Sequence, residues 1–198
     1  KLELTQLQQT FWISADAHRY VVKFEAGAVY AELTDIGHSK PGEPNQYRDE
    51  SRGVTLTAPH GWHFYHQPIP GKAKKKVLFL LDPEVAAASL VELFKTADLD
   101  DDEKTSVRAW AESDLPDLKK RFGEFEVRAD SWKERTIDGS PAISVTADYV
   151  EGDVKKVAYA TYVLGESTSA GFLVMIERDG FDDFAKKFEP ILEGYEVK

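Results

Sequence analysis

The stretch GVTLTAPHGW (residues 53–62) opens a series of charged, strand-like alternations, and GFDDFAKKFEPIL (residues 180–192) closes it as a short amphipathic helix. Each segment of the series has one apolar face, which only a neighbouring layer of structure can cover. The pattern therefore predicts an α+β fold, a largely antiparallel β-sheet covered by helices. It predicts no chemistry, because no catalytic motif lies in these segments.

Four strand-like segments on short turns precede the closing helix. Asp138-Gly139 and Glu151-Gly152-Asp153 are typical turn sequences, and sequential strands on short turns form an antiparallel meander. We expect Asp179 to cap the closing helix, whose phenylalanines fall on one stripe. The expected strands are residues 125–129, 142–150, 157–164 and 172–176.

A longer helix is predicted over residues 102–122, before the meander. Asp100 with Glu103 three residues later has the pattern of a capping box, and apolar residues recur at helical spacing after it. Pro116 should bend this helix or split it near Ser113. Residues 84–95 remain open between helix and strand, because Asp82-Pro83 favours a helix start while residues 90–94 would also form a strand.

The N-terminal part of the chain has a different pattern of apolar and turn-forming residues. Residues 20–25 and 28–33 flank Ala26-Gly27 and predict a β-hairpin with Gly27 at positive φ. Residues 37–49 have the composition of a linker or long surface loop. We therefore expect residues 1–50 to form a hairpin and linker packed on the main domain, because an isolated hairpin is only marginally stable. Residues 51–198 are the predicted main domain.

Composition narrows the function classes. The formal charge of −10, from 35 acidic and 25 basic residues, argues against a nucleic-acid partner. The absence of cysteine excludes disulfides, thiolate metal sites and cysteine nucleophiles. The longest dense apolar run, residues 77–81, is far too short for a transmembrane segment. A start at Lys1 is consistent with a processed precursor or a trimmed chain, and we expect an extracytoplasmic protein, periplasmic or on the cell surface.

The order of elements resembles the Mog/PsbP-like sandwich. That group includes the PsbP extrinsic photosystem subunits, the Ran-binding import factor Mog and DcrB-like bacterial lipoproteins. The resemblance covers about residues 50–198 and lies in the Pro59-His60-Gly61-Trp62 turn, the long crossing helix, the Asp138-Gly139-Ser140-Pro141-Ala142 turn, the meander and the closing helix. It implies a strand over residues 86–94. It implies an accessory or partner-binding role with no shared active site, so no catalytic residues carry over.

Three of the five histidines, His60, His63 and His66, form the most conspicuous cluster of metal-ligand residue types. Imidazole suits zinc, copper or nickel, and three could leave an open coordination position. In an extended segment, however, His63 points away from the other two. We interpret the three as turn and edge-strand residues, with a metal site as the alternative.

Trp62 and Tyr65, beside these histidines, could line a surface for a ligand or partner. Aromatic residues next to a turn more often close the end of a core, which we favour for Trp62. The serines of residues 165–171 lack nucleophile-elbow spacing, and no phosphate-binding or metalloprotease motif occurs. We therefore predict a non-enzymatic accessory or partner-binding domain of an exported bacterial protein without a cofactor, its partner a protein or a small ligand. The alternatives are a small-molecule or metal-binding protein using residues 60–66, and the terminal module of a larger enzyme.

Overall fold

The computed structural model describes residues 2–4, 9–13, 21–26, 29–32, 44–67, 75–81 and 87–197. The chain divides into two compact units, Lys1–Lys40 and Pro41–Lys198. In the first unit, four strands form an antiparallel sheet in sequence order: β1 (Leu2–Leu4), β2 (Gln9–Ile13), β3 (Val21–Ala26) and β4 (Val29–Glu32). Pairing of β3 with β4 confirms the predicted hairpin, and Gly27 lies outside the described residues.

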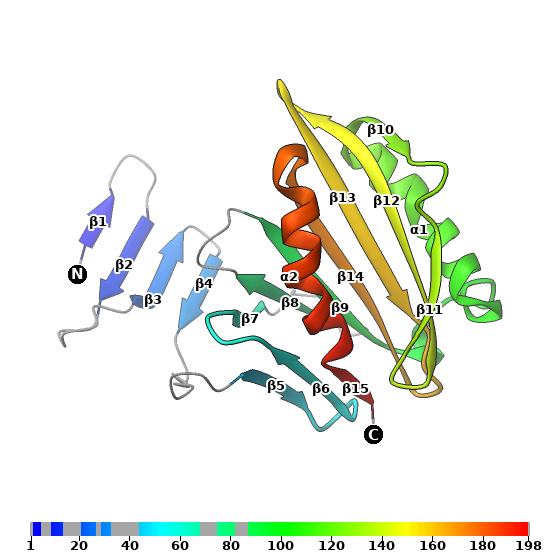
Figure 1. Ribbon diagram of the computed structural model, residues 1–198. Coiled ribbons are helices and arrows are strands. Elements are labelled where there is room, and N and C mark those ends of the chain that lie inside the picture. Colours follow the sequence, from blue (N-terminus) through cyan, green and yellow to red (C-terminus); the bar gives the residue numbers. More distant parts are fainter. Residues whose placement is uncertain are drawn as a thin grey trace. The chain divides into compact units, whose positions relative to one another are not determined.

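The second unit is built on a large antiparallel sheet with the strand order β10-β12-β13-β14-β9-β8-β7, in which β11 also pairs with β12. The predicted meander is present as β12, β13 and β14 (Figure 1). The strands are β7 (His63–Gln67), β8 (Lys75–Leu81), β9 (Ala88–Lys95), β10 (Gly123–Val127), β11 (Lys133–Ile137), β12 (Ser140–Glu151), β13 (Val154–Val163) and β14 (Thr168–Glu177).

A small antiparallel sheet and two α-helices complete this unit. The small sheet has the order β15-β6-β5. Short 3₁₀ turns precede both helices. The elements are β5 (Asn45–Asp49), β6 (Val54–Ala58), β15 (Tyr195–Val197), α1 (Val107–Arg121) and α2 (Phe181–Glu193), with the 3₁₀ turns η1 (Thr96–Asp98), η2 (Glu103–Thr105) and η3 (Arg178–Gly180).

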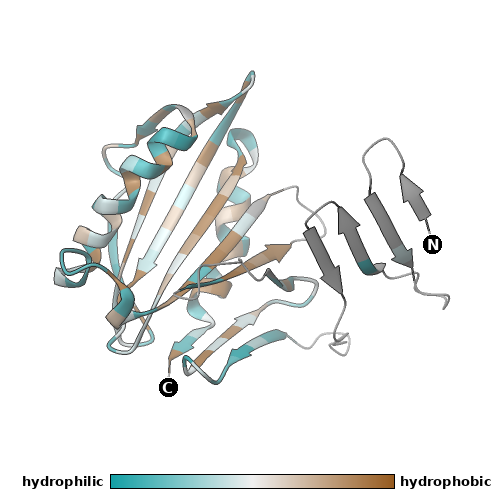
Figure 2. Ribbon diagram, turned by 180° about the vertical axis from the view of Figure 1, so that it is seen from behind, coloured by the Kyte–Doolittle hydropathy of each residue, from teal (hydrophilic) through white to brown (hydrophobic). Residues whose placement is uncertain are grey.

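Each face of the large sheet has its own core. On one face, α2 and the small sheet enclose a cluster that includes Phe184 and Phe188 (Figure 1). On the other face, α1 packs Trp110 and Leu118 against β12 and β13. Seen from that side, α1 lies toward the β12 end, and no described helix covers the β7–β8 end (Figure 2). The α+β sandwich predicted from the sequence is confirmed.

The predicted turn at Asp138-Gly139 is confirmed, but the strand that enters it is different. Both residues have positive φ, 47° and 76°, as a two-residue hairpin turn requires. The entering strand is β11, which has no strand-like pattern in the sequence because only Ile137 of its residues is buried. Strands β10 and β11 both pair with β12, whose length accommodates them one after the other.

The long helix begins later than predicted. Glu103 Oε2 accepts the Asp100 N–H at 2.9 Å, so the capping contact exists, but it starts only the 3₁₀ turn η2. The α-helix begins after Ser106, whose Oγ accepts the Ala109 N–H at 3.1 Å. The expectation of a split is wrong, because α1 continues through Pro116 to Arg121.

Three further expectations are settled. Ala88–Lys95 forms β9, which resolves the ambiguity over residues 84–95 in favour of the strand for this part, while residues 84–86 lie outside the described residues. Asn45–Asp49 forms β5 rather than loop, since it pairs along its whole length with β6. Gly180, not Asp179, is the N-cap residue of α2, and it supplies no side-chain bond. Among the described residues, no helix combines the length and apolar character needed to cross a membrane.

Candidate partner-binding surface

The turn before β7 anchors this strand to the core. Gly61 has a φ of 94°, which favours glycine, and the Trp62 N–H donates to the Pro59 carbonyl at 3.2 Å. The Trp62 side chain is 5% exposed, and its ring lies 5.7 Å from that of Phe184 and 6.2 Å from that of Phe188. Trp62 is therefore a core residue, as favoured from the sequence, rather than part of an exposed ligand or partner surface.

Strands β7 and β8 carry exposed apolar side chains on the face away from α2. His63 pairs with Leu81 and Tyr65 with Phe79, so these four share one face of the sheet; Leu78 and Leu80 alternate with them and lie in the α2 core. Tyr65 is 49% exposed and Leu81 52%. We call this surface the outer patch; it consists of His63, Tyr65, Phe79 and Leu81.

The opposite face of the same two strands ends at a buried carboxylate. Asp49, the last residue of β5, has a side chain that is only 2% exposed. Its Oδ2 lies 2.7 Å from Lys76 Nζ and 3.4 Å from an Arg52 nitrogen. Its Oδ1 accepts hydrogen bonds from the Ser51 hydroxyl at 2.5 Å and from the Ser51 N–H at 3.1 Å. We call Asp49, Ser51, Arg52 and Lys76 the Asp49 cluster.

Positive charge exceeds negative charge in this cluster. Burial raises the pKa of Asp49, but hydrogen bonds from Lys76 and Ser51 and the two nearby cations outweigh it, so the pKa is lowered overall. The Arg52 side chain is 8% exposed, and its Nε is buried without an acceptor. The pKa of His66 is lowered by burial and by Lys76 and Arg52, with Asp49 opposing.

The three histidines do not come together. His60 is exposed in the turn before β7, while His63 and His66 lie at odd and even positions of one strand and so face opposite sides. Within the described residues, no group of three histidine or acidic side chains could hold a metal ion. His66 instead lies beside the Asp49 cluster, a placement that no local sequence pattern indicates.

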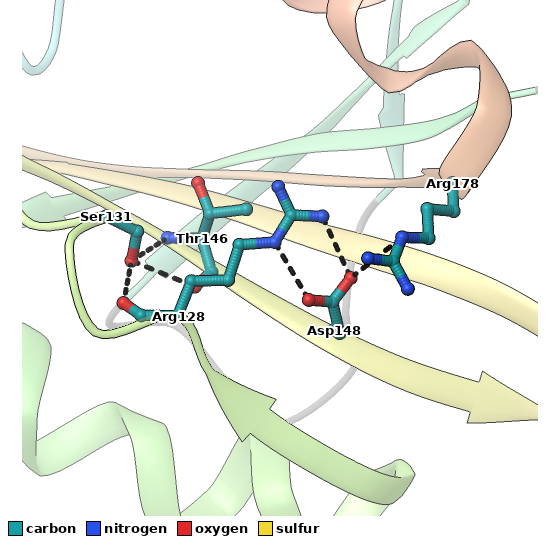
Figure 3. A network of polar contacts seen from close by, with 5 residues as sticks. All are labelled: Arg128, Ser131, Thr146, Asp148 and Arg178. Carbon is teal, nitrogen blue, oxygen red and sulfur yellow. Dashed lines mark hydrogen bonds and ion pairs between the residues drawn. The ribbon is translucent and has the colours of Figure 1, made fainter.

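The strongest exposed polar network has a structural role. Arg128 donates two hydrogen bonds of 2.8 Å to Asp148, and Arg178 approaches the same carboxylate at 3.8 Å (Figure 3). The Ser131 hydroxyl bonds the Arg128 and Thr146 carbonyls. These contacts join the end of β10 to β12 and to η3. The charge-assisted hydrogen bonds between Arg128 and Asp148 brace this part of the sheet.

Buried hydroxyls elsewhere are also engaged in the fold. Tyr162 donates a 2.7 Å hydrogen bond to Asp114 of α1; desolvation raises the pKa of both groups. In the serine-rich segment, Ser169 is fully buried in β14 and its hydroxyl shares a 2.8 Å hydrogen bond with Thr96. Neither hydroxyl has a histidine beside it among these contacts. Their hydrogen bonds hold α1 and the β9 end against the sheet.

Comparison with known proteins identifies the fold. No protein-family model matches the chain, and no curated protein matches its sequence. Among solved structures, PsbP (CyanoP) of the cyanobacterium Synechocystis superimposes with a TM-score of 0.56 at 15% identity, covering 84% of this chain and 99% of that one. The fold is PsbP-like. LpqN of Mycobacterium tuberculosis, described as involved in cell envelope biogenesis, gives a TM-score of 0.51 at 18% identity, covering 82% and 88%. The PsbP-like fold confirms the resemblance drawn from the Pro59–Trp62 turn and the order of elements.

Proposed function

We propose that this chain is a non-enzymatic accessory domain of an exported bacterial protein and that it binds a protein partner through the outer patch. The observation that carries this proposal is the exposure of Tyr65 and Leu81 on adjacent strands of one sheet face. Covering a large apolar side chain gains about 1.5–3 kcal/mol relative to full exposure. Tyrosine is moreover enriched at protein interfaces and among their energetically dominant residues.

The absence of an assembled reaction centre among the described residues supports a binding role. The buried hydroxyls of Tyr162 and Ser169 are held in structural hydrogen bonds, and the three candidate histidines do not converge. A reaction centre needs a nucleophile within hydrogen-bonding reach of a base. Reproducible turnover of a small-molecule panel, abolished by one polar substitution, would contradict the non-enzymatic proposal.

Export is supported by the shared fold of LpqN, a protein described as involved in cell envelope biogenesis. Fold alone does not fix location, so the proposal needs its own test. Antibody detection after fractionation of the native organism should place the protein in the envelope or extracellular fraction. Recovery in the cytosolic fraction alone would end this part of the proposal.

Three forms of the protein test the outer patch. Wild type, the double variant Tyr65→Ser/Leu81→Ser and the control Val154→Ser are used to capture partners from a native envelope extract. Val154 is a matched control, because it is 41% exposed and lies at the β12–β13 turn. We expect at least one protein to be retained by wild type and by the control, and lost by the double variant. Retention of the same proteins by all three forms would refute the outer patch as the binding surface.

A further inference from the structure

The outer edge of β7 is occupied, so a partner reaches the outer patch only from the face of the sheet. Strand β5 contacts β7, and the Tyr47 ring lies 6.2 Å from that of Phe64. A side-chain N–H of Asn45 donates to the Trp62 carbonyl. A partner on the sheet face binds through side chains alone. A helix suits this position, because its backbone hydrogen bonds are satisfied internally and helices commonly cover sheet faces.

The apolar surface continues from the outer patch to the foot of α1. Tyr65 pairs with Phe79, which pairs with Leu90, and Leu90 pairs with Leu173 of β14. The four side chains therefore form one row on a single face. Tyr65 is 49% exposed and Leu173 only 8%, with Phe79 and Leu90 between them. Strands lie about 4.8 Å apart, so the open part of the row over β7, β8 and β9 is about 10 Å wide, the width of one helix.

Gly171 marks the place where the cover by α1 ends. In the neighbouring row, Gly171 pairs with Tyr162 on one side and with Glu92 on the other. A Cβ on Gly171 would lie 3.9 Å from the Trp110 ring of α1, yet Gly171 is partly exposed in the middle of the sheet. Glu92, on the open side, has a side chain that is 29% exposed and lies 2.5 Å from Lys75 Nζ.

Asp114 is the acidic residue of α1 that lies at this boundary. The other two, Glu112 and Asp117, are each paired with a cation of α1 itself, whereas Asp114 has no ion-pair partner among the described residues. It remains exposed, although its Oδ2 accepts the Tyr162 hydroxyl at 2.7 Å. Desolvation raises the pKa of Asp114, and the charge of Glu92 raises it further against the Tyr162 hydrogen bond. A cation beside Asp114 would favour its ionised form.

We propose that an amphipathic basic helix of the protein partner packs on the outer patch beside α1 and places a lysine or arginine between Asp114 and Glu92. Its apolar side chains would cover Tyr65, Phe79 and Leu81. No described helix covers this half of the sheet face (Figure 2), and the net charge of −10 attracts a basic partner. The inference rests on the proposed function and specifies the secondary structure and the charge of the partner.

Two synthetic helical peptides of about 18 residues test the preference. Both carry the same leucine stripe, and their polar faces carry lysine in one and glutamate in the other. Each is titrated into the ¹⁵N-labelled full chain at physiological salt. We expect the lysine peptide to shift the amide signals of β8, β9 and Gly171 and to bind at least about tenfold more tightly than the glutamate peptide. Equal affinities, or shifts confined to other elements, would overturn the inference.

A matched pair of variants separates the two carboxylates from the net charge. Asp114→Asn/Glu92→Gln removes both charges and keeps an acceptor for Tyr162. The control Asp153→Asn/Glu151→Gln removes the same charge at the β12–β13 turn, where Glu151 is likewise paired with a lysine. Affinity for the lysine peptide should fall at least about fivefold in the first variant and less than about twofold in the control. If the first variant does not fold, Glu92→Gln is compared with Glu151→Gln. Equal losses would assign the preference to net charge and refute the inference.

The outcomes distinguish this inference from the proposed function. If Tyr65→Ser/Leu81→Ser loses the cellular partner but the lysine peptide has no preference, the basic-helix inference fails and the outer patch stands. If neither the partner nor the peptide depends on the patch, both fail. Sedimentation of wild type as a dimer that Tyr65→Ser dissociates would assign the surface to a second copy and also contradict the inference.

Discussion

Lys76 Nζ lies 2.7 Å from Oδ2 of the buried Asp49, so one ion pair joins β8 of the large sheet to β5 of the small sheet. The contact holds the β7–β8 hairpin against the small sheet. A buried carboxylate is tolerated only when its charge and lone pairs are satisfied, and here Ser51 and Arg52 complete the set.

Removal of this carboxylate should be costly. Asp49→Ala leaves the buried Arg52 and the partly buried Lys76 without their counter-charge, and loss of one member of a buried pair typically costs about 3–5 kcal/mol. Urea unfolding monitored by tryptophan fluorescence measures the change. The matched control Asp101→Ala removes a fully exposed partner of Lys104 and should leave the midpoint unchanged. Similar midpoints for both variants would show that the Asp49 cluster contributes little.

The same pair predicts a pH dependence. The pKa of Asp49 is lower in the folded state than its ordinary value, because its hydrogen bonds and nearby cations outweigh burial. The contribution of the Asp49 carboxylate to folding stability is therefore fully present above the pKa of the unfolded state, about 3.9. It is lost as the pH falls through the lower pKa of the folded state. The stability difference between wild type and Asp49→Ala should be constant from neutral pH to about pH 5 and shrink below about pH 4. A difference that grows on acidification would contradict this sign.

Truncating two aromatic residues that lie three positions apart should lower the unfolding free energy by very different amounts. Trp62→Ala removes a buried ring packed on Phe184 and Phe188 and should cost about 3–5 kcal/mol of unfolding free energy. Tyr65→Ala truncates a half-exposed side chain and should change it by no more than about 0.5 kcal/mol. Chemical denaturation followed by circular dichroism compares them. Equal losses would mean that Tyr65 is a core residue and not part of a binding surface.

The C-terminal end of α2 has no room for a side chain. A Cβ on Gly194 would meet the Thr57 carbonyl oxygen at 2.4 Å and the Pro190 carbonyl oxygen at 3.1 Å, and the Gly194 carbonyl itself accepts the Thr57 N–H at 2.9 Å. Gly194→Ala should therefore cost about 1–3 kcal/mol. Gly171→Ala, whose Cβ would make only ordinary contacts of 3.9 and 4.0 Å, is the control in the same thermal-unfolding assay. A neutral Gly194→Ala would show that α2 and β6 are less closely packed than described.

Metal binding should not depend on the three histidines acting together. His60, His63 and His66 do not converge in the described structure, so a triple-alanine variant should bind zinc, copper and nickel as weakly as wild type. Isothermal titration calorimetry makes the comparison. Tight one-to-one binding by wild type that is lost in the variant would revive the metal-binding alternative.

The parts of the fold that are local in sequence were predictable. The Asp138-Gly139 turn needs only its two residues, and the stripe carrying Phe184 and Phe188 is visible at helical spacing. Strand β11 was missed because its pairing with β12, not its own composition, makes it a strand. The same holds for Asn45–Asp49, whose polar residues resemble a loop until β6 lies beside them.

For a similar reason, only part of the candidate site could be predicted from the sequence. Tyr65 could be named from its place beside the Trp62 turn, but its exposure depends on α1 lying toward the other end of the sheet. The Asp49 cluster could not be named at all, because Lys76 approaches Asp49 only after two sheets pack together. Packing of the N-terminal hairpin on the main domain stays a prediction.

A photo-reactive amino acid placed at Tyr65, with Val154 as the control position, tests the outer patch most directly. Irradiation in native cells, followed by mass spectrometry of the adducts, identifies what lies against each site. We predict a discrete adduct between position 65 and one other protein, and none at position 154. Equal, diffuse labelling at both positions, or a link from position 65 only to residues 1–40 of the same chain, would contradict a partner-binding role for this surface.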